Sequence, residues 1–251
     1  MTRRLKRSTR ANPREDRNIG NKRVRNNIIE LEQFNQHLKS RVELVPKNLN
    51  QETYIDKLED PSVDIVFAVG PAGTGKTLLA TLWAIQCLKD GTAKKVVITR
   101  PNIALDDRDI GFLPGDIYGK MAPWTRPILE VFEDYYSPKT IQTMLENNII
   151  ELLPMAYVRG RTLKNSVVIL DEAQNTTKNS MISALTRIGD GSKMIVTGDI
   201  KQSDRGDHNG LTDFLARYRS HSRIAVIEFE RQDVERHPVI GTLLKWYGEE
   251  D

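Results

Sequence analysis

The stretch Gly70-Pro71-Ala72-Gly73-Thr74-Gly75-Lys76-Thr77 decides the fold of this chain. It matches the pattern G-x-x-x-x-G-K-[ST] at every fixed position. The apolar run Ile65–Val69 precedes it and predicts a buried strand. The segment Leu78–Leu88 follows it and predicts a helix, which Gly91 terminates. A strand, a glycine-rich turn and a helix in this order are the context of a phosphate-binding loop, and a fortuitous glycine turn is the alternative.

In such a loop the glycines allow backbone N–H groups to turn inward around a β-phosphate, and the helix N-terminus adds a favourable dipole. Lys76 is expected to reach the β- and γ-phosphates, and the Thr77 hydroxyl to ligate Mg²⁺. The predicted phosphate-binding residues, which the family resemblance described below assigns to ATP, are Gly70, Pro71, Ala72, Gly73, Thr74, Gly75, Lys76, Thr77 and Leu78.

Strand and helix patterns alternate along the rest of the chain. Further strands are predicted at Val96–Thr99, Ile149–Leu152, Val167–Leu170, Met194–Thr197 and Ile224–Ile227. Helical spacing recurs at Asn179–Ile188, Leu211–Tyr218 and Val239–Trp246. This alternation predicts an α/β fold in which a mostly parallel sheet is sandwiched between helices.

Two acids follow the predicted strand Val167–Leu170 directly, and ligands of open parallel sheets bind at that end of the strands. Asp171 is expected to hold Mg²⁺ through water, and Glu172 to polarise the attacking water, which favours hydrolysis over transfer to a substrate hydroxyl. The alternative is a strand that ends in a solvated acid pair. Gln202 is a further candidate for sensing the γ-phosphate or orienting water, although a structural turn explains it equally well.

The charge of the chain is segregated. The 251 residues carry a net charge of +3, but residues 1–25 hold ten Arg or Lys and two acids. We expect a basic, disordered arm at residues 1–27, a helical connector at 28–47 and one ATPase domain at 48–251. Mean hydropathy of -0.47 argues against a membrane protein. The single cysteine, Cys87, excludes a disulfide scaffold and favours the cytoplasm, or a host's cytoplasm if the gene belongs to a bacteriophage.

Together these stretches resemble the PhoH family of P-loop ATPases, which is related to superfamily 1 helicases and has a RecA-like core. The resemblance covers roughly residues 50–247. Besides the phosphate loop, the matching stretches are Thr99–Pro101, Gly111–Asp116, Lys120, Pro123, Arg126-Pro127, Tyr157–Leu163, Ile169–Thr177, Thr186–Gly189, Gly191–Asp199 and Arg236–Pro238. The family commonly continues as x-D-L-P after Gln202, whereas this chain has Ser203–Gly206.

The resemblance implies roles for two residues outside the phosphate loop. Gln51 is similar to a glutamine that contacts adenine, with a solvated loop amide as the alternative. Arg236 is similar to an arginine finger, which often acts from a neighbouring subunit, and Arg231 is its close competitor. The predicted catalytic residues are therefore Lys76, Asp171, Glu172, Gln202 and Arg236.

The resemblance also implies ATP and Mg²⁺ as ligands and a homo-hexameric ring. The chain resembles the single-domain form of the family, so any nuclease activity is expected from a separate partner protein. We expect helicase-like remodelling of RNA or single-stranded nucleic acid. The rival hypothesis is an ATP-dependent switch or assembly protein that does not translocate.

Four arginines on segments that follow strands are candidates for gripping nucleic acid by its backbone: Arg100, Arg126, Arg159 and Arg161. Tyr157 is a candidate for base stacking, or else a packed side chain. The alternative for the arginines is pairing with acids such as Asp106, Asp107, Asp109 and Asp116. The basic arm is a second candidate, because its cations would contact phosphates without sequence preference.

Overall fold

The structure is a computed structural model. It describes residues 42–101, 117–206, 208–236, 239–240, 243 and 246, with only the backbone described at 117–123. The basic arm, most of the predicted connector and the stretch Gly111–Asp116 lie outside these residues. No helix in the described part of the chain is long and apolar enough to cross a bilayer.

Six parallel strands form one sheet in the order β3-β2-β4-β5-β1-β6. The strands are β1 (Ile65–Val69), β2 (Lys95–Thr99), β3 (Ile150–Leu152), β4 (Ser166–Leu170), β5 (Lys193–Gly198) and β6 (Ile224–Glu228). Strand β5 lies between β1 and β4, and its Gly198 is in register with Val69 of β1. The carboxyl ends of these three strands therefore meet at one edge, which is where open parallel sheets bind their ligands.

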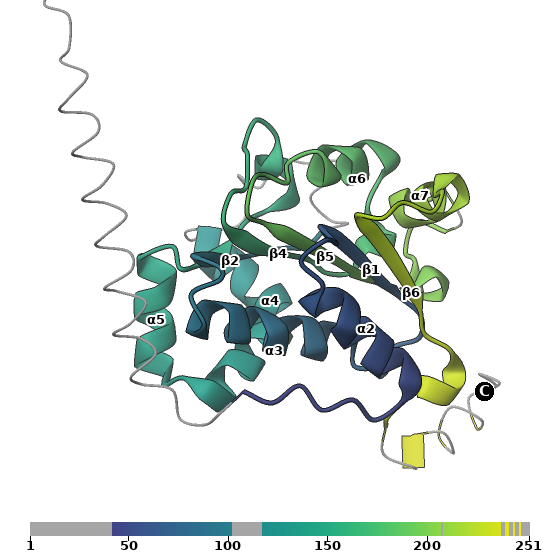
Figure 1. Cartoon of the computed structure of the whole chain (residues 1–251), viewed down its shortest axis with the longest axis horizontal. Helices are drawn as coiled ribbons and strands as arrows, with labels where there is room; N and C mark the ends of the chain where they lie inside the picture. Colours follow the sequence, from purple (N-terminus) through teal and green to yellow (C-terminus); the bar gives the residue numbers. More distant parts are fainter. Residues whose placement is uncertain are drawn as a thin grey trace, which may run out of the picture.

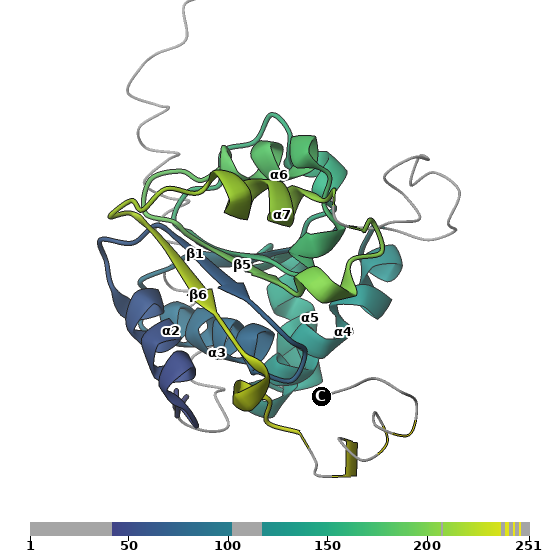
Figure 2. The ribbon, with the colours of Figure 1, turned by 90° about the vertical axis from the view of Figure 1, so that its right-hand side faces the viewer.

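Helices cover both faces of the sheet (Figures 1 and 2). On one face lie α2 (Leu49–Glu59), α3 (Lys76–Lys89), α4 (Ile117–Tyr135) and α5 (Pro138–Glu146); on the other lie α6 (Lys178–Leu185) and α7 (Gly210–Arg217). Short 3-10 turns lie at η2 (Met155–Val158), η3 (Ala173–Asn175), η4 (Ile200–Gln202) and η5 (Arg231–Asp233).

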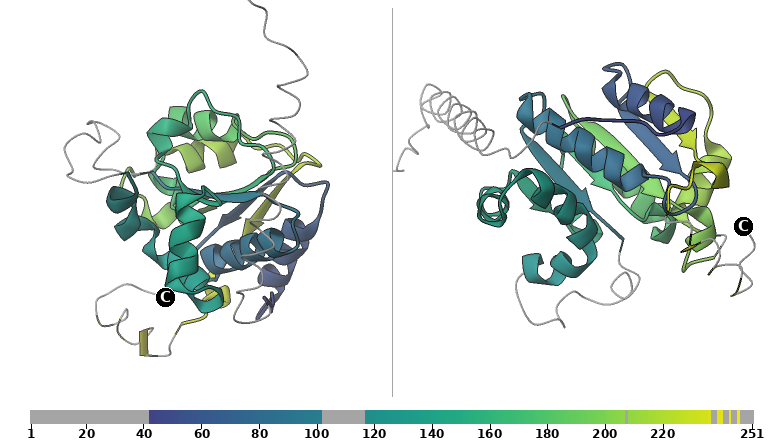
Figure 3. Two further views of the ribbon diagram at one scale, coloured as in Figure 1. Left: turned by 90° about the vertical axis from the view of Figure 1, so that its left-hand side faces the viewer. Right: turned by 90° about the horizontal axis from the view of Figure 1, so that it is seen from below.

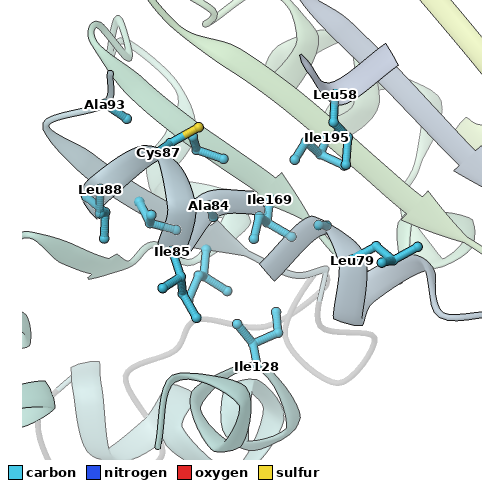
Figure 4. Close-up of a cluster of buried hydrophobic side chains, with 14 of the residues drawn as sticks. Leu58, Leu79, Ala84, Ile85, Cys87, Leu88, Ala93, Ile128, Ile169 and Ile195 are labelled. Atoms are coloured by element: carbon cyan, nitrogen blue, oxygen red, sulfur yellow. The ribbon is translucent and has the colours of Figure 1, made fainter. Parts of the chain in front are cut away.

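Each face has its own apolar core. The larger one packs α3 against the sheet, with Ala84 and Ile85 fully buried on the helix and Ile169 and Ile195 fully buried on the strands (Figure 4). Helix α3 lies between α2 and α4 when the molecule is viewed from below (Figure 3). The helix that starts at the phosphate loop is therefore held on three sides, which fixes the position of its N-terminus.

All six predicted strands are confirmed to within one residue at either end, and the predicted helices correspond to α3, α6 and α7. The described residues of Val239–Trp246 are helical. The predicted connector differs where it is described, since residues 42–46 precede α2 without helical structure and Val42 packs into the core. Pro46 contributes to the difference at Val45, because a proline disfavours the helical conformation of the residue before it.

Candidate active site

The phosphate loop connects β1 to α3 in a conformation that needs its glycines. Gly70, Gly73 and Gly75 have φ angles of 146°, 89° and 82°, which L-residues rarely adopt. A Cβ at Gly70 would collide with the carbonyl of Phe229, which follows β6. Gly75 precedes α3 and offers no side-chain cap, so the first N–H groups of this helix have no partner from a capping side chain. Such N–H groups suit a phosphate.

Lys76 is buried and directed back into the loop. Its ammonium donates to the carbonyl oxygens of Gly70 and Pro71 at 2.7 and 2.6 Å and to the hydroxyl of Thr74 at 3.2 Å. Burial lowers the pKa of Lys76, which Asp199 and the two acids after β4 oppose and Arg236 reinforces. The loop therefore concentrates positive charge at the predicted position of the β- and γ-phosphates.

Asp171 is buried at the end of β4 and is held by two hydroxyls. Thr77 donates to its Oδ1 from α3 at 2.9 Å, and Thr197 donates to the same oxygen from β5 at 2.6 Å. This burial excludes the alternative of a solvated acid pair at Asp171. A hydroxyl and a carboxylate in contact beside a phosphate site are the ligands that Mg²⁺ uses together with substrate phosphates. No group of three or more His, Cys, Asp or Glu side chains that could hold a metal gathers among the described residues.

Glu172 adopts a left-handed backbone conformation with φ 55°, which turns its side chain out of the strand direction. The side-chain amide of Gln174 donates to its Oε2, and the guanidinium of Arg100 lies 3.2 Å from its Oε1. Arg100 also lies 3.9 Å from Asp171 and donates to the carbonyl of Trp124 in α4 at 2.8 Å. Both oxygens of the predicted base are therefore engaged by other side chains.

Gln174 connects the end of β4 to the end of β5. Besides the bond that its side chain donates to Glu172, its side-chain amide oxygen accepts from the N–H of Asp199 at 3.1 Å. A Cβ at Gly198 would collide with this amide oxygen, so glycine is needed at the end of β5. One buried side-chain amide thus links the two segments of the pocket that follow β4 and β5.

The predicted residues from three segments meet in one pocket of about 270 Å³. Its lining comprises Ala72, Gly73, Gly75, Lys76, Thr77, Leu78, Asp171, Glu172, Thr197, Gly198, Asp199 and Gln202. Gln202 ends the 3-10 turn after β5 and faces this pocket, as its predicted role requires. Pro71 and Thr74 contribute through their bonds to Lys76.

Gln51 is buried in the first turn of α2 rather than solvated in a loop, so that alternative is wrong. Its amide donates to the carbonyl of Thr74 at 3.1 Å and its oxygen accepts from the N–H of Lys47 at 2.8 Å. Tyr54, one turn later, donates to the carbonyl of Lys76. Helix α2 thus supports the phosphate loop from behind, and adenine binding by Gln51 stays a prediction.

Arg236 lies against the phosphate loop of its own chain. A Cβ at Gly73 would collide with its side chain, and the N–H of Glu235 donates to the carbonyl of Gly73 at 2.9 Å. Buried Asp233 anchors this segment, because its carboxylate accepts from Asn50 of α2 at 2.7 Å. Arg231 and Arg236 are both exposed and neither lines the pocket, but of the two it is Arg236 whose side chain lies against Gly73. The predicted arginine finger therefore has a position in cis.

Three of the four predicted nucleic-acid arginines pair with acids of the same chain. Arg126 contacts Glu130 and Glu133 on its own helix, and Arg161 pairs with Glu151 of β3. Arg100 pairs with the acids of the pocket, as described above. The acids differ from the proposed partners Asp106, Asp107, Asp109 and Asp116, which lie outside the described residues.

The fourth arginine, Arg159, is exposed and has no ion pair with the described residues. Tyr157 is 51% exposed, so packing does not explain it. Nucleic-acid binding by these side chains stays a prediction.

Sequence reasoning missed several residues of the site. Thr197, Gln174 and the Asn50–Asp233 pair were not assigned roles, and Arg100 was assigned to nucleic acid alone. Thr197 carries a signal, because its hydroxyl follows three apolar residues near the end of β5. The other contacts join segments far apart in the chain and have no local signature.

Comparison with known proteins agrees with this geometry. The model of the PhoH family, described as PhoH-like protein, matches residues 43–248. A PhoH-like protein of Bacillus subtilis is 41% identical over 207 residues, which cover 82% of this chain and 64% of the relative. Protein PhoH of Escherichia coli K12 is 38% identical over 208 residues, which cover 81% and 58%. The chain thus matches about three fifths of the length of these curated relatives.

Solved structures give more distant matches. The SWI2/SNF2 ATPase core of Sulfolobus solfataricus in complex with dsDNA aligns at 15% identity and a TM-score of 0.39, over 63% of this chain and 34% of that one. The Pif1 helicase of Candida albicans aligns at 14% identity and a TM-score of 0.34, over 75% and 41%. At these scores the alignments support no functional inference. With its phosphate loop, its Asp171–Glu172 pair and the family match over most of its length, this chain belongs to the PhoH family.

Proposed function

We propose that this chain is a Mg²⁺-dependent ATPase whose turnover is coupled to binding or remodelling of RNA or another single-stranded nucleic acid. The observation that carries the ATPase is the bridge from Thr77 to Asp171 beside Lys76, because it joins the two halves of a nucleotide site across three strands. When bound there, Mg²⁺ would neutralise charge on the phosphates. Thr77 and Asp171 would hold it, the latter through water.

We assign each group at the pocket a separate role in hydrolysis. The N–H groups of the loop and Lys76 would bind the phosphates and stabilise charge on the departing ADP. Glu172 would accept a proton from the water that attacks the γ-phosphorus, as the bond to the bridging oxygen breaks. Gln202 would orient that water. Arg236 would add positive charge over Gly73.

The nucleic-acid partner rests on exposed Tyr157 and Arg159, which follow β3 at the carboxyl edge of the sheet, and on the basic arm. A helicase-like homo-hexamer and a separate nuclease partner follow from the family alone. The rival function is a switch or assembly protein whose ATP holds a ring together without translocation.

The decisive experiment measures ATP hydrolysis by the full chain with and without single-stranded RNA or DNA at low salt. We expect Mg²⁺-dependent turnover that nucleic acid accelerates. Glu172→Gln should retain ATP binding and lose about 100- to 10,000-fold in turnover. Glu146→Gln, at an exposed carboxylate of α5, is the matched control and should behave as wild type. Turnover that no nucleic acid changes would favour the switch, and full activity of Glu172→Gln would remove its catalytic role.

A further inference from the structure

Arg100 has an unusual position for a residue that binds nucleic acid. It follows β2 directly, with its side chain 27% exposed, and its guanidinium lies between the acids of the pocket and helix α4. Strand β2 is the neighbour of β4 in the sheet, and the N–H of Asp171 donates to the carbonyl of Thr99, the residue before Arg100. Its place beside Glu172 is therefore set by the register of two buried strands.

The contact places a positive charge on the predicted general base. The guanidinium of Arg100 lies 3.2 Å from Oε1 of Glu172 while Gln174 donates to Oε2, so each oxygen already has a polar neighbour. A carboxylate polarises water by accepting its hydrogen bond, and a neighbouring guanidinium competes for the same lone pairs. Glu172 held in this way is a weaker acceptor for the attacking water.

Arg100 also follows directly after a residue that contacts the turn expected to meet a nucleic-acid strand. The hydroxyl of Thr99 contacts the sulfur of Met155, which begins the 3-10 turn that carries exposed Tyr157 and leads to exposed Arg159. A phosphate bound at this surface would compete with Glu172 for the guanidinium, since arginine binds carboxylate and phosphate with the same paired geometry.

Building on the function proposed above, we propose that Arg100 couples nucleic-acid binding to ATP hydrolysis. Without bound nucleic acid, Arg100 pairs with Glu172 and weakens it as a general base. A backbone phosphate of single-stranded RNA or DNA draws the guanidinium away and leaves Oε1 free for the attacking water. Arg100 is thus a positioning residue that acts through Glu172.

Arg100→Gln tests the coupling. We expect hydrolysis without nucleic acid to rise about three- to tenfold, because the base is released, while the fold-stimulation by single-stranded RNA falls towards one. The dependence of log affinity for the strand on log salt should become shallower by about one. Arg100→Lys should give intermediate values, because one ammonium cannot match the paired geometry of a guanidinium. Arg217→Gln, at an exposed arginine paired with Asp213 on α7, is the charge-matched control and should leave all these values unchanged.

The double variant Arg100→Gln/Glu172→Gln shows whether the added turnover passes through Glu172, in which case it should be as inactive as Glu172→Gln. Thermal unfolding shows whether each variant is folded. A folded Arg100→Gln protein with reduced basal turnover and unchanged fold-stimulation overturns the coupling. If Arg100→Gln is unfolded, Arg100→Lys decides instead, and wild-type basal turnover and stimulation in Arg100→Lys overturn the coupling. Wild-type turnover that nucleic acid never stimulates also overturns it, while the ATPase itself stands. Wild-type protein without ATP hydrolysis instead removes the proposed function.

Discussion

Two lysines at opposite edges of the sheet make a direct comparison. Lys76 lies beyond the carboxyl end of β1, and Lys193 begins β5 at the amino edge. Each donates to three oxygens of the chain: Lys193 bonds the carbonyls of Lys57, Leu58 and Asp60 at 2.6–3.1 Å, where α2 ends. Its ammonium also lies 5.2 Å from the ring of Trp83. Burial lowers the pKa of both lysines.

The difference lies in the helix end that each lysine meets. Lys193 complements the negative end of α2, whereas Lys76 opens α3 at the positive end of its dipole. The carbonyl end of α2 thus compensates the charge of Lys193. The charge of Lys76 is instead compensated by anions, which here are Asp199, Glu172 and Asp171 and, in the proposed function, the phosphates of ATP. Of these two lysines, the one beside the candidate site is therefore the one that its local helix dipole repels.

The comparison predicts that replacing Lys76 removes activity without removing stability. In Lys76→Met we expect ATP turnover to fall by at least about 1000-fold, because phosphate contacts in the transition state are lost. The free energy of unfolding should stay within about 1 kcal/mol of wild type, since the position at the positive end of the helix dipole offsets the three hydrogen bonds that Lys76 makes. Steady-state hydrolysis and urea unfolding check both values. A loss of several kcal/mol would mean that Lys76 is as structural as Lys193.

Arg236 is a second cation beside the phosphate loop, and we expect it, like Lys76, to matter more for activity than for stability. We expect Arg236→Ala to lower turnover about 100-fold with little change in unfolding, because the side chain lies over Gly73 and contributes positive charge there. Mixing Arg236→Ala with Glu172→Gln subunits tests whose site it serves. Its position in cis predicts no recovery of hydrolysis in the mixture, and recovery would show that it acts across subunits.

Lys193 should show the reverse pattern. Lys193→Met leaves the carbonyls at the end of α2 without their donor, which should lower the free energy of unfolding by about 1–3 kcal/mol. Turnover of the folded protein should not change, because no residue of the pocket contacts Lys193. ATP with Mg²⁺ should raise the melting temperature of this variant as it does in wild type, and should not do so in Lys76→Met. Loss of turnover in folded Lys193→Met would show that Lys193, at the amino edge of the sheet, also contributes to ATP hydrolysis.

The sequence predicted the strands and the phosphate loop much better than the helices and long-range contacts that hold them in place. Strands and the phosphate loop have local signatures, namely short apolar runs and fixed glycine spacing. Helix α4 was missed because Pro123 and Pro127 fall inside it, and α5 was missed although Ser137 caps it and Pro138 opens it. Helix α2 has an N-cap signal at Asn48 that was also missed. The hydrogen bond from Asn50 to Asp233 joins residues 183 positions apart, and no local sequence pattern reveals such a contact.

The smallest expected effect is a pH dependence of stability. Burial lowers the pKa of Lys193 from its ordinary 10.5 to about 8. Between these values the unfolded chain binds more protons than the folded one, so this lysine makes the protein more stable as pH rises from about 8 to 10.5. The stability advantage of wild type over Lys193→Met should therefore grow between pH 7 and pH 10. Because the ammonium is partly exposed, we expect a gain of only about 1 kcal/mol or less.

Urea unfolding of both proteins across this range measures that difference directly. Lys139→Met, at an exposed lysine of α5, serves as the control and should track wild type at every pH. An advantage of wild type that shrinks at high pH would show that the three carbonyl bonds outweigh burial and hold the proton on Lys193. In that case the lysine at the amino edge is a fully satisfied helix cap, and Lys76 would remain the one of the pair whose charge is destabilised by its position.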